Sequence, residues 1–109
     1  SYISFLEGIQ CLKKRYPTDK ICAIVSSMAE LGASSGEIHD RLVPIFDGID
    51  LIVVDKGDLY QSLVKSQRSF RYFTVSAVKK QLPDLVKCYS AIYLKGANKY
   101  RISDIVNSR

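Results

Sequence analysis

The chain has 109 residues, of which 47% are hydrophobic and 25% are charged, as in an ordinary folded domain. No apolar stretch approaches the roughly 20 residues that a membrane-spanning helix needs. The three cysteines, Cys11, Cys22 and Cys88, form no CxxC pair, and with a single histidine they cannot make a tetrahedral zinc site. We therefore expect reduced thiols and neither metal nor cofactor.

Charge is distributed unevenly along the chain. Residues 1–55 hold five basic and eight acidic residues, whereas residues 56–109 hold eleven basic and three acidic residues. A basic half that also contains aromatic residues is typical of a protein that binds a polyanion. Nucleic acid is the commonest such partner, because each neutralised phosphate releases counterions. The alternative is a solvated basic surface without a partner.

The first part of the chain predicts three helices. Apolar residues recur at helical spacing over residues 2–15, and the basic run at 13–15 suits a helix C-terminus. A second helix is predicted over residues 18–32, between Pro17 and Gly32. Its apolar stripe consists of Ile21, Ile24, Val25 and Met28. Ser34 and Glu37 fit a capping box at the start of a third helix, which should end near Pro44.

The middle of the chain is less regular. Residues 51–54 are apolar and β-branched, which predicts a buried strand followed by a turn. Residues 58–65 fit either a returning strand or a helix. Residues 70–75 alternate and predict a strand. Residues 76–82 predict a helix that either ends at Pro83 or continues with a kink to Lys87.

The end of the chain has the clearest pattern. Residues 90–94 and 99–103 flank a turn at 95–98, which predicts a β-hairpin with basic residues at its tip. Three helices followed by a hairpin is the element order of a winged helix. We expect one shared core formed by Leu6, Ile9, Ile21, Ile24, Val25, Ile38 and Leu42.

Short segments also carry a family resemblance. Residues 12–17 (LKKRYP) precede residues 20–25 (KICAIV), and residues 93–96 (YLKG) precede residues 99–101 (KYR). These segments resemble the first loop, second helix and wing of the atherin-type winged helix, which is also found at the N-terminus of the MOZ and MORF histone acetyltransferases.

The resemblance implies one α+β winged-helix domain over residues 1–109, with three or four helices and a C-terminal β-hairpin wing. The family domain is shorter, so an extra segment or a partial second unit is expected within residues 31–75. The Lys-Gly turn at Lys56 aligns with the wing as an alternative to the turn at Lys95. Asp50, Asp55 and Asp58 flank the earlier turn and would repel phosphate, which favours the later one.

The resemblance further implies a non-enzymatic module that binds double-stranded DNA in a nuclear chromatin or transcription protein. Leu94 precedes the wing lysine and cannot hydrogen-bond a base edge, which argues against the family's preference for unmethylated CpG. The expected DNA contacts are Lys13, Lys14, Arg15, Lys79, Lys80, Lys95, Lys99 and Arg101.

Other interpretations stay open. A winged helix could instead bind protein, such as another chromatin protein, through its acidic and apolar residues between 37 and 58. Arg68 and Arg71 lie among aromatic residues at 70–73, where they could stack on nucleic acid or extend from a buried aromatic cluster. His39 and Asp40 are adjacent and so point off different faces of a helix, and no catalytic residues are predicted.

Overall fold

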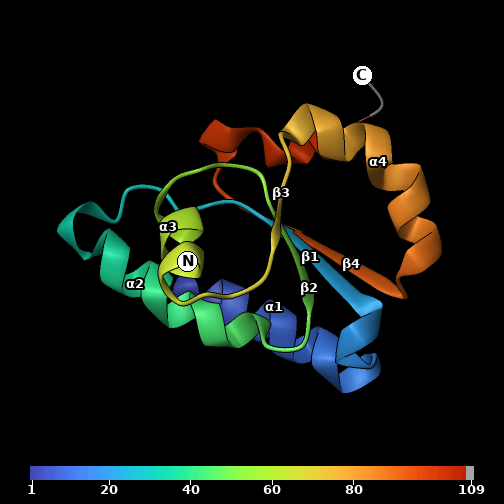
Figure 1. Cartoon of the computed structure of the whole chain (residues 1–109), viewed down its shortest axis with the longest axis horizontal. Coiled ribbons are helices and arrows are strands. Elements are labelled where there is room, and N and C mark those ends of the chain that lie inside the picture. The colour runs from blue at the N-terminus through green and yellow to red at the C-terminus, as the bar shows by residue number, and fades with distance from the viewer. Residues whose placement is uncertain (108–109) are drawn as a thin grey trace.

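Four parallel strands form a single sheet in the order β3-β2-β1-β4 in the computed structural model, which describes residues 1–107 (Figure 1). The strands are β1 (Ile21–Val25), β2 (Asp50–Val53), β3 (Arg71–Tyr72) and β4 (Ala91–Lys95). The helices are α1 (Tyr2–Arg15), α2 (Ser35–Leu42), α3 (Asp58–Lys65) and α4 (Val75–Cys88). The chain is therefore α/β, and the prediction of an α+β winged helix is wrong.

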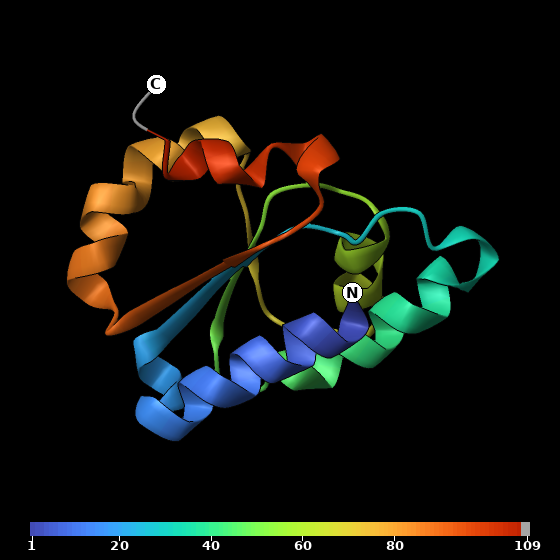
Figure 2. The same ribbon diagram turned by 180° about the vertical axis from the view of Figure 1, so that it is seen from behind.

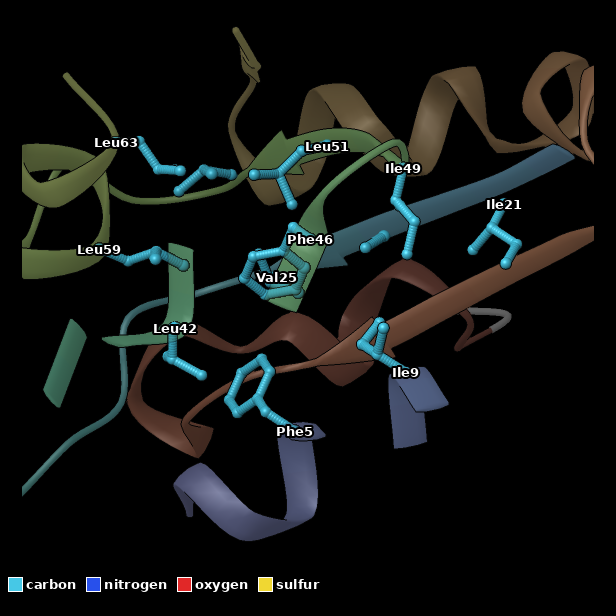
Figure 3. Close-up of a cluster of buried hydrophobic side chains, with 12 residues drawn as sticks. Phe5, Ile9, Ile21, Val25, Leu42, Phe46, Ile49, Leu51, Leu59 and Leu63 are labelled. Carbon is cyan, nitrogen blue, oxygen red and sulfur yellow. The ribbon is translucent and has the colours of Figure 1, made fainter. Parts of the chain in front are cut away.

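Helices cover both faces of the sheet, as Figure 2 shows from behind. Helices α1, α2 and α3 bury their apolar residues against one face, where Phe5, Phe46 and Leu59 meet the sheet (Figure 3). Helix α4 and a short 3-10 helix at Ile102–Ile105 cover the other face. Two hydrophobic cores result, one on each side of the strands.

The central strand β1 was expected to be a helix. All five of its residues are fully buried, because the two faces of the strand pack into different cores. Ala23 belongs to the first core and Ile24 to the second. A parallel strand buried on both faces has a continuous apolar run instead of an alternating one. In so short a run, the spacing Ile21, Ile24, Val25 fits a helix equally well.

The C-terminal hairpin is also absent. Strand β4 pairs with β1 in parallel, with Ile21 opposite Ala91 and Val25 opposite Lys95. The chain then turns through 3-10 geometry at Asn98–Tyr100 and a left-handed Arg101, with φ of 56°. Ile102 and Ile105 lie on one side of the following 3-10 helix and enter the second core, so they cannot alternate as a return strand would.

Several other expectations can be compared with these elements. The helix over residues 2–15, the helix after Ser34 and the strand at residues 51–54 are confirmed, although Ser34 makes no side-chain cap. Residues 58–65 form a helix, and α4 continues through Pro83 to Cys88. Only Arg71–Tyr72 of the expected 70–75 strand pairs with the sheet.

The expected single core is corrected in the same way. Ile9, Ile21, Val25 and Leu42 do share the first core, but Ile24 faces the second one across the sheet. Leu6 and Ile38 are partly exposed.

Candidate functional site

Buried polar side chains gather where the strands end. Among the described residues, five polar side chains are buried: Ser26, Ser27, His39, Asp55 and Ser62. The first two follow β1 and Asp55 lies just beyond β2, while His39 bonds to the loop after β1. We call this end of the sheet the carboxyl edge; it comprises Lys95 at the end of β4 and the loops at residues 26–34, 54–57 and 96–101.

The strand order makes this edge the expected place for a ligand. The chain passes from β1 to β2 through α2 on one face, and from β3 to β4 through α4 on the other face. The strand order therefore reverses between β1 and β4. In open parallel sheets, ligands bind outside the carboxyl ends of the strands at such a reversal.

Asp55 ties the loops after β1 and β2 together. Its Oδ1 accepts a hydrogen bond from the backbone N–H of Ser27, and its Oδ2 accepts one from the N–H of Gly57, both at 2.9 Å. The Ser27 hydroxyl oxygen accepts from the N–H of Leu59 at 3.0 Å, in the first turn of α3. These bonds hold the two loops in one fixed arrangement.

Ser26 joins β1 to the loop after β4. Its hydroxyl donates to the carbonyl of Ser27 and accepts from the N–H of Ala97, each at 2.9 Å. The approach is so close that a Cβ added at Gly96 would lie 2.2 Å from Ser26 Oγ. Position 96 therefore requires glycine.

The two Lys-Gly turns take equivalent places in this arrangement. Gly57 follows β2 and Gly96 follows β4, and these strands are the two neighbours of β1. A Cβ at Gly57 would lie 2.7 Å from Asp55 Oδ2, so this glycine too is required by close packing. Neither turn is the tip of a hairpin wing.

His39 fixes the loop after β1. Its Nε2 accepts a hydrogen bond from the N–H of Met28 at 2.8 Å. Its Nδ1 therefore carries the proton and donates to the Ser35 carbonyl at 2.7 Å. With both ring nitrogens engaged, His39 holds backbone and has no free lone pair for base catalysis.

The Cys22 thiol is equally unsuited to chemistry. It lies fully buried in β1, and burial raises its pKa to about 11. The thiol stays protonated at neutral pH, and the thiolate is the nucleophilic form.

A hollow of about 310 Å³ opens at the carboxyl edge. It is lined by Ser27, Met28, Ala29, Glu30, Leu31, Gly32, Ser35, Gly57, Asp58, Lys99 and Tyr100. Its charged groups are two carboxylates and the Lys99 ammonium, which lies 5.0 Å from the centre of the Tyr100 ring. Glu30 adopts a left-handed backbone with φ of 63°, a costly conformation for a residue with a Cβ.

A smaller hollow of about 130 Å³ lies beside it. The two hollows share Met28, Ala29 and Leu31, and the smaller one adds Phe5 and Lys95. Lys95 Nζ lies 5.9 Å from the centre of the Phe5 ring. Residues 28–31, which include Glu30 with its left-handed backbone, therefore line or adjoin both hollows at this edge.

The predicted DNA contacts do not share one surface. Lys95, Lys99 and Arg101 belong to the carboxyl edge, where Arg101 pairs with Asp104 at 2.9 Å. The basic run at residues 13–15 ends α1, which leads into the opposite end of β1. Lys13 there donates to the carbonyl of Ile45 at 3.1 Å.

The two lysines of α4 lie on a third part of the molecule. Lys79 Nζ donates to the carbonyl of Asp104 at 3.1 Å and to that of Asn107, and so fastens the C-terminal 3-10 segment to α4. Lys80 is exposed. DNA binding by these residues stays a prediction.

Sequence reasoning missed Ser26, Ser27, Asp55 and Gly96 as site residues. Their signal lies in the positions after each apolar run: Ser-Ser after β1, Asp-Lys-Gly after β2 and Lys-Gly-Ala-Asn after β4. Small and polar residues after successive buried strands are typical of a carboxyl edge, but this pattern is visible only once residues 21–25 are identified as a strand.

Within residues 1–107, no group of three or more His, Cys, Asp or Glu side chains is placed to hold a metal ion. None of the helices in that range is long and apolar enough to cross a membrane. No protein-family model matches the chain, and no curated protein is significantly similar to it.

Proposed function

We propose that this chain is a small-molecule-binding domain whose site is the 310 Å³ hollow at the carboxyl edge. The observation that carries the proposal is the concentration of buried polar side chains there. Burying a polar group costs stability unless it is hydrogen-bonded, and Ser26, Ser27, His39 and Asp55 all hold loop backbone around this edge. Such rigid support is what a binding site needs.

The lining indicates the class of ligand. Glu30 and Asp58 offer negative charge, while Lys99 and the Tyr100 hydroxyl offer a cation and a hydrogen-bonding group. A small molecule that carries both a cationic and an anionic group complements this lining. The volume lies at the lower end of the range for small-molecule pockets.

We propose binding without catalysis at this edge. The buried side chains act as supports for the loops. Both ring nitrogens of His39 bond to other groups, and each oxygen of the Asp55 carboxylate accepts from a backbone N–H group.

A titration followed by NMR tests the proposal. Phosphoethanolamine and taurine, which carry both charges, are added to the ¹⁵N-labelled chain, with inorganic phosphate and ethylamine as single-charge comparisons. We expect saturable shifts at residues 27–32, 57–58 and 99–100 with the first pair only. Lys99→Gln and Glu30→Gln should each weaken binding about tenfold, the loss of one charge-assisted contact.

The matched control is Lys14→Gln, which removes one exposed positive charge at the far end of α1. It should leave the affinity unchanged. Shifts that do not saturate, or that lie outside the carboxyl edge, would overturn the proposal.

Duplex DNA serves as the second arm of the same titration, since Lys95 and Lys99 lie at this edge. If the edge binds DNA, Lys95→Ala and Lys99→Ala should each lower the slope of log affinity against log salt by about 0.9. Absence of duplex binding at about 50 mM salt, where non-specific contacts are still strong, would end the DNA prediction.

A further inference from the structure

A larger hollow of about 430 Å³ lies at the amino ends of β2 and β3, opposite the carboxyl edge. It forms where β2 and β3 diverge, because their pairing begins only at Ile52 and Arg71. The hollow is lined by Gly48, Ile49, Asp50, Leu51, Arg68, Ser69, Phe70 and Arg71. Nothing in the carboxyl-edge site uses these residues.

Arg68 is fixed in place by backbone carbonyls. One of its terminal nitrogens donates to Phe46 O at 2.7 Å and to Ile49 O at 2.5 Å, and the other donates to Ser69 O. Carbonyl groups orient a guanidinium without neutralising its charge. Two of its five N–H groups, including the one on Nε, are not used by these bonds.

Arg71 is oriented by a hydrogen-bonded chain. Its terminal nitrogen donates to the Tyr89 hydroxyl at 3.1 Å, and Tyr89 in turn donates to Asp50. Burial, together with the hydrogen bond to Asp50, raises the pKa of Tyr89 to about 12, so the phenol keeps its proton. The chain sets the direction of the Arg71 side chain while leaving most of its donors unused.

Neither guanidinium has a carboxylate partner. The ion pairs within residues 1–107 are Lys65–Asp40 and Arg101–Asp104, so no carboxylate oxygen in that range lies within 4.0 Å of Arg68 or Arg71. Two oriented, uncompensated guanidinium groups at one hollow form a site with net positive charge, even with Asp50 counted. Guanidinium groups bind phosphate and carboxylate through paired N–H donors.

We propose that this hollow binds the oxyanion of a small molecule, a phosphate or a carboxylate group, between Arg68 and Arg71. The ring of Phe70, which packs edge-on against Tyr60 at 5.2 Å between centroids, supplies an apolar wall for the rest of the ligand. The site is separate from the carboxyl edge, so each can be tested without the other.

Titration of the ¹⁵N-labelled chain with inorganic pyrophosphate and with citrate tests this site, and the two probes separate phosphate from carboxylate. We expect saturable shifts of the Arg68 and Arg71 Nε–H signals and of the amides of residues 48–51. Arg71→Gln should weaken binding about tenfold, as expected for one lost charge-assisted pair. Asp50→Asn should strengthen it, because a like charge beside the oxyanion is removed.

Further variants keep the test decisive. Arg68→Gln should weaken binding as Arg71→Gln does. If the loss of its carbonyl bonds unfolds that variant, Arg68→Lys keeps the charge and should still weaken binding, because the planar fork is lost. Arg41→Gln removes an exposed arginine of α2 that lies over the Tyr2 ring, and it should change nothing. Absence of saturable pyrophosphate and citrate shifts, or an unchanged affinity for both probes in Arg71→Gln, would overturn the site. Tighter binding of a DNA duplex at the same signals would overturn the small-molecule assignment.

Discussion

Gly96 and Ser26 show how one atom constrains the sequence at the carboxyl edge. The Ser26 hydroxyl occupies the space that a Cβ at position 96 would need, at 2.2 Å, and it also accepts from the N–H of Ala97. The same side chain therefore bonds the loop after β4 and makes any residue with a Cβ unfavourable at position 96. Asp55 constrains position 57 in the same way, because a Cβ added at Gly57 would lie 2.7 Å from Asp55 Oδ2.

Gly96→Ala should destabilise the chain by about 1–3 kcal/mol, because the added methyl group must displace Ser26. In a Ser26→Gly background the same change should cost much less, since the obstructing side chain is gone. Urea unfolding of the four proteins in this double-mutant cycle gives the coupling. An equal cost of Gly96→Ala in both backgrounds would show that the contact does not limit position 96.

At the scale of elements, the sequence predicts α1, α2, β2 and α4 well, because each has a clear periodicity or a distinct boundary. Strand β1 is wrongly predicted as a helix, whereas β4 is correctly predicted as a strand but with the wrong partner. β1 is buried on both faces and so lacks alternation, and β4 alternates but pairs with residues 70 positions earlier, which no local pattern shows. Strand β3 has only two residues, and it is part of the sheet because Arg71 and Tyr72 pair with Ile52 and Val53.

The contact between α2 and α3 should make stability depend on pH. Hydrogen bonds from Lys65, at 2.6 Å, and Ser62, at 2.7 Å, lower the pKa of Asp40 below its usual value. The carboxylate is thus favoured in the folded state. Its contribution is present above the unfolded pKa of about 3.9 and is lost as pH falls through the lower folded pKa.

The urea midpoint of the wild type should therefore fall between about pH 5 and pH 2, and Asp40→Asn should reduce that fall. The effect is modest, since the paired side chains are exposed by 69% and 39%. Asp47→Asn, in the exposed loop before β2, is the comparison. Identical pH profiles for wild type and Asp40→Asn would contradict this role.

At the scale of the whole molecule, one sheet separates two cores. Phe5 and Ile9 of α1 belong to the core on one face, and Leu85 of α4 with Ile105 of the C-terminal 3-10 helix belong to the other. The candidate site depends on this arrangement, because the loops meet only when the strands are parallel. The small and polar residues of the site are visible in the sequence. That they lie close together depends on the parallel pairing of β1 with β4, and it could not be predicted without that pairing.

Ile9→Ala and Ile105→Ala should each destabilise the chain by about 2–4 kcal/mol, because each creates a cavity in a closed core. The two residues lie on opposite faces and share no core, so their effects should add within about 0.5 kcal/mol. Unfolding of both single variants and the double variant in urea measures this. A marked departure from additivity would mean that the sheet transmits strain between the cores.

The late position of β4 in the chain has a consequence for biosynthesis. β1 and β2 leave the ribosome early and can pair at once, whereas the other side of β1 waits for Ala91–Lys95. Throughout that interval the nascent chain exposes the unpaired edge of β1 and a second core that still lacks Ile102 and Ile105, features that recruit strands from other chains. Closure of so long a loop is slow because its entropy cost precedes any gain from the contacts. Strand β4 therefore protects the edge of β1 from other chains and also positions part of the candidate site.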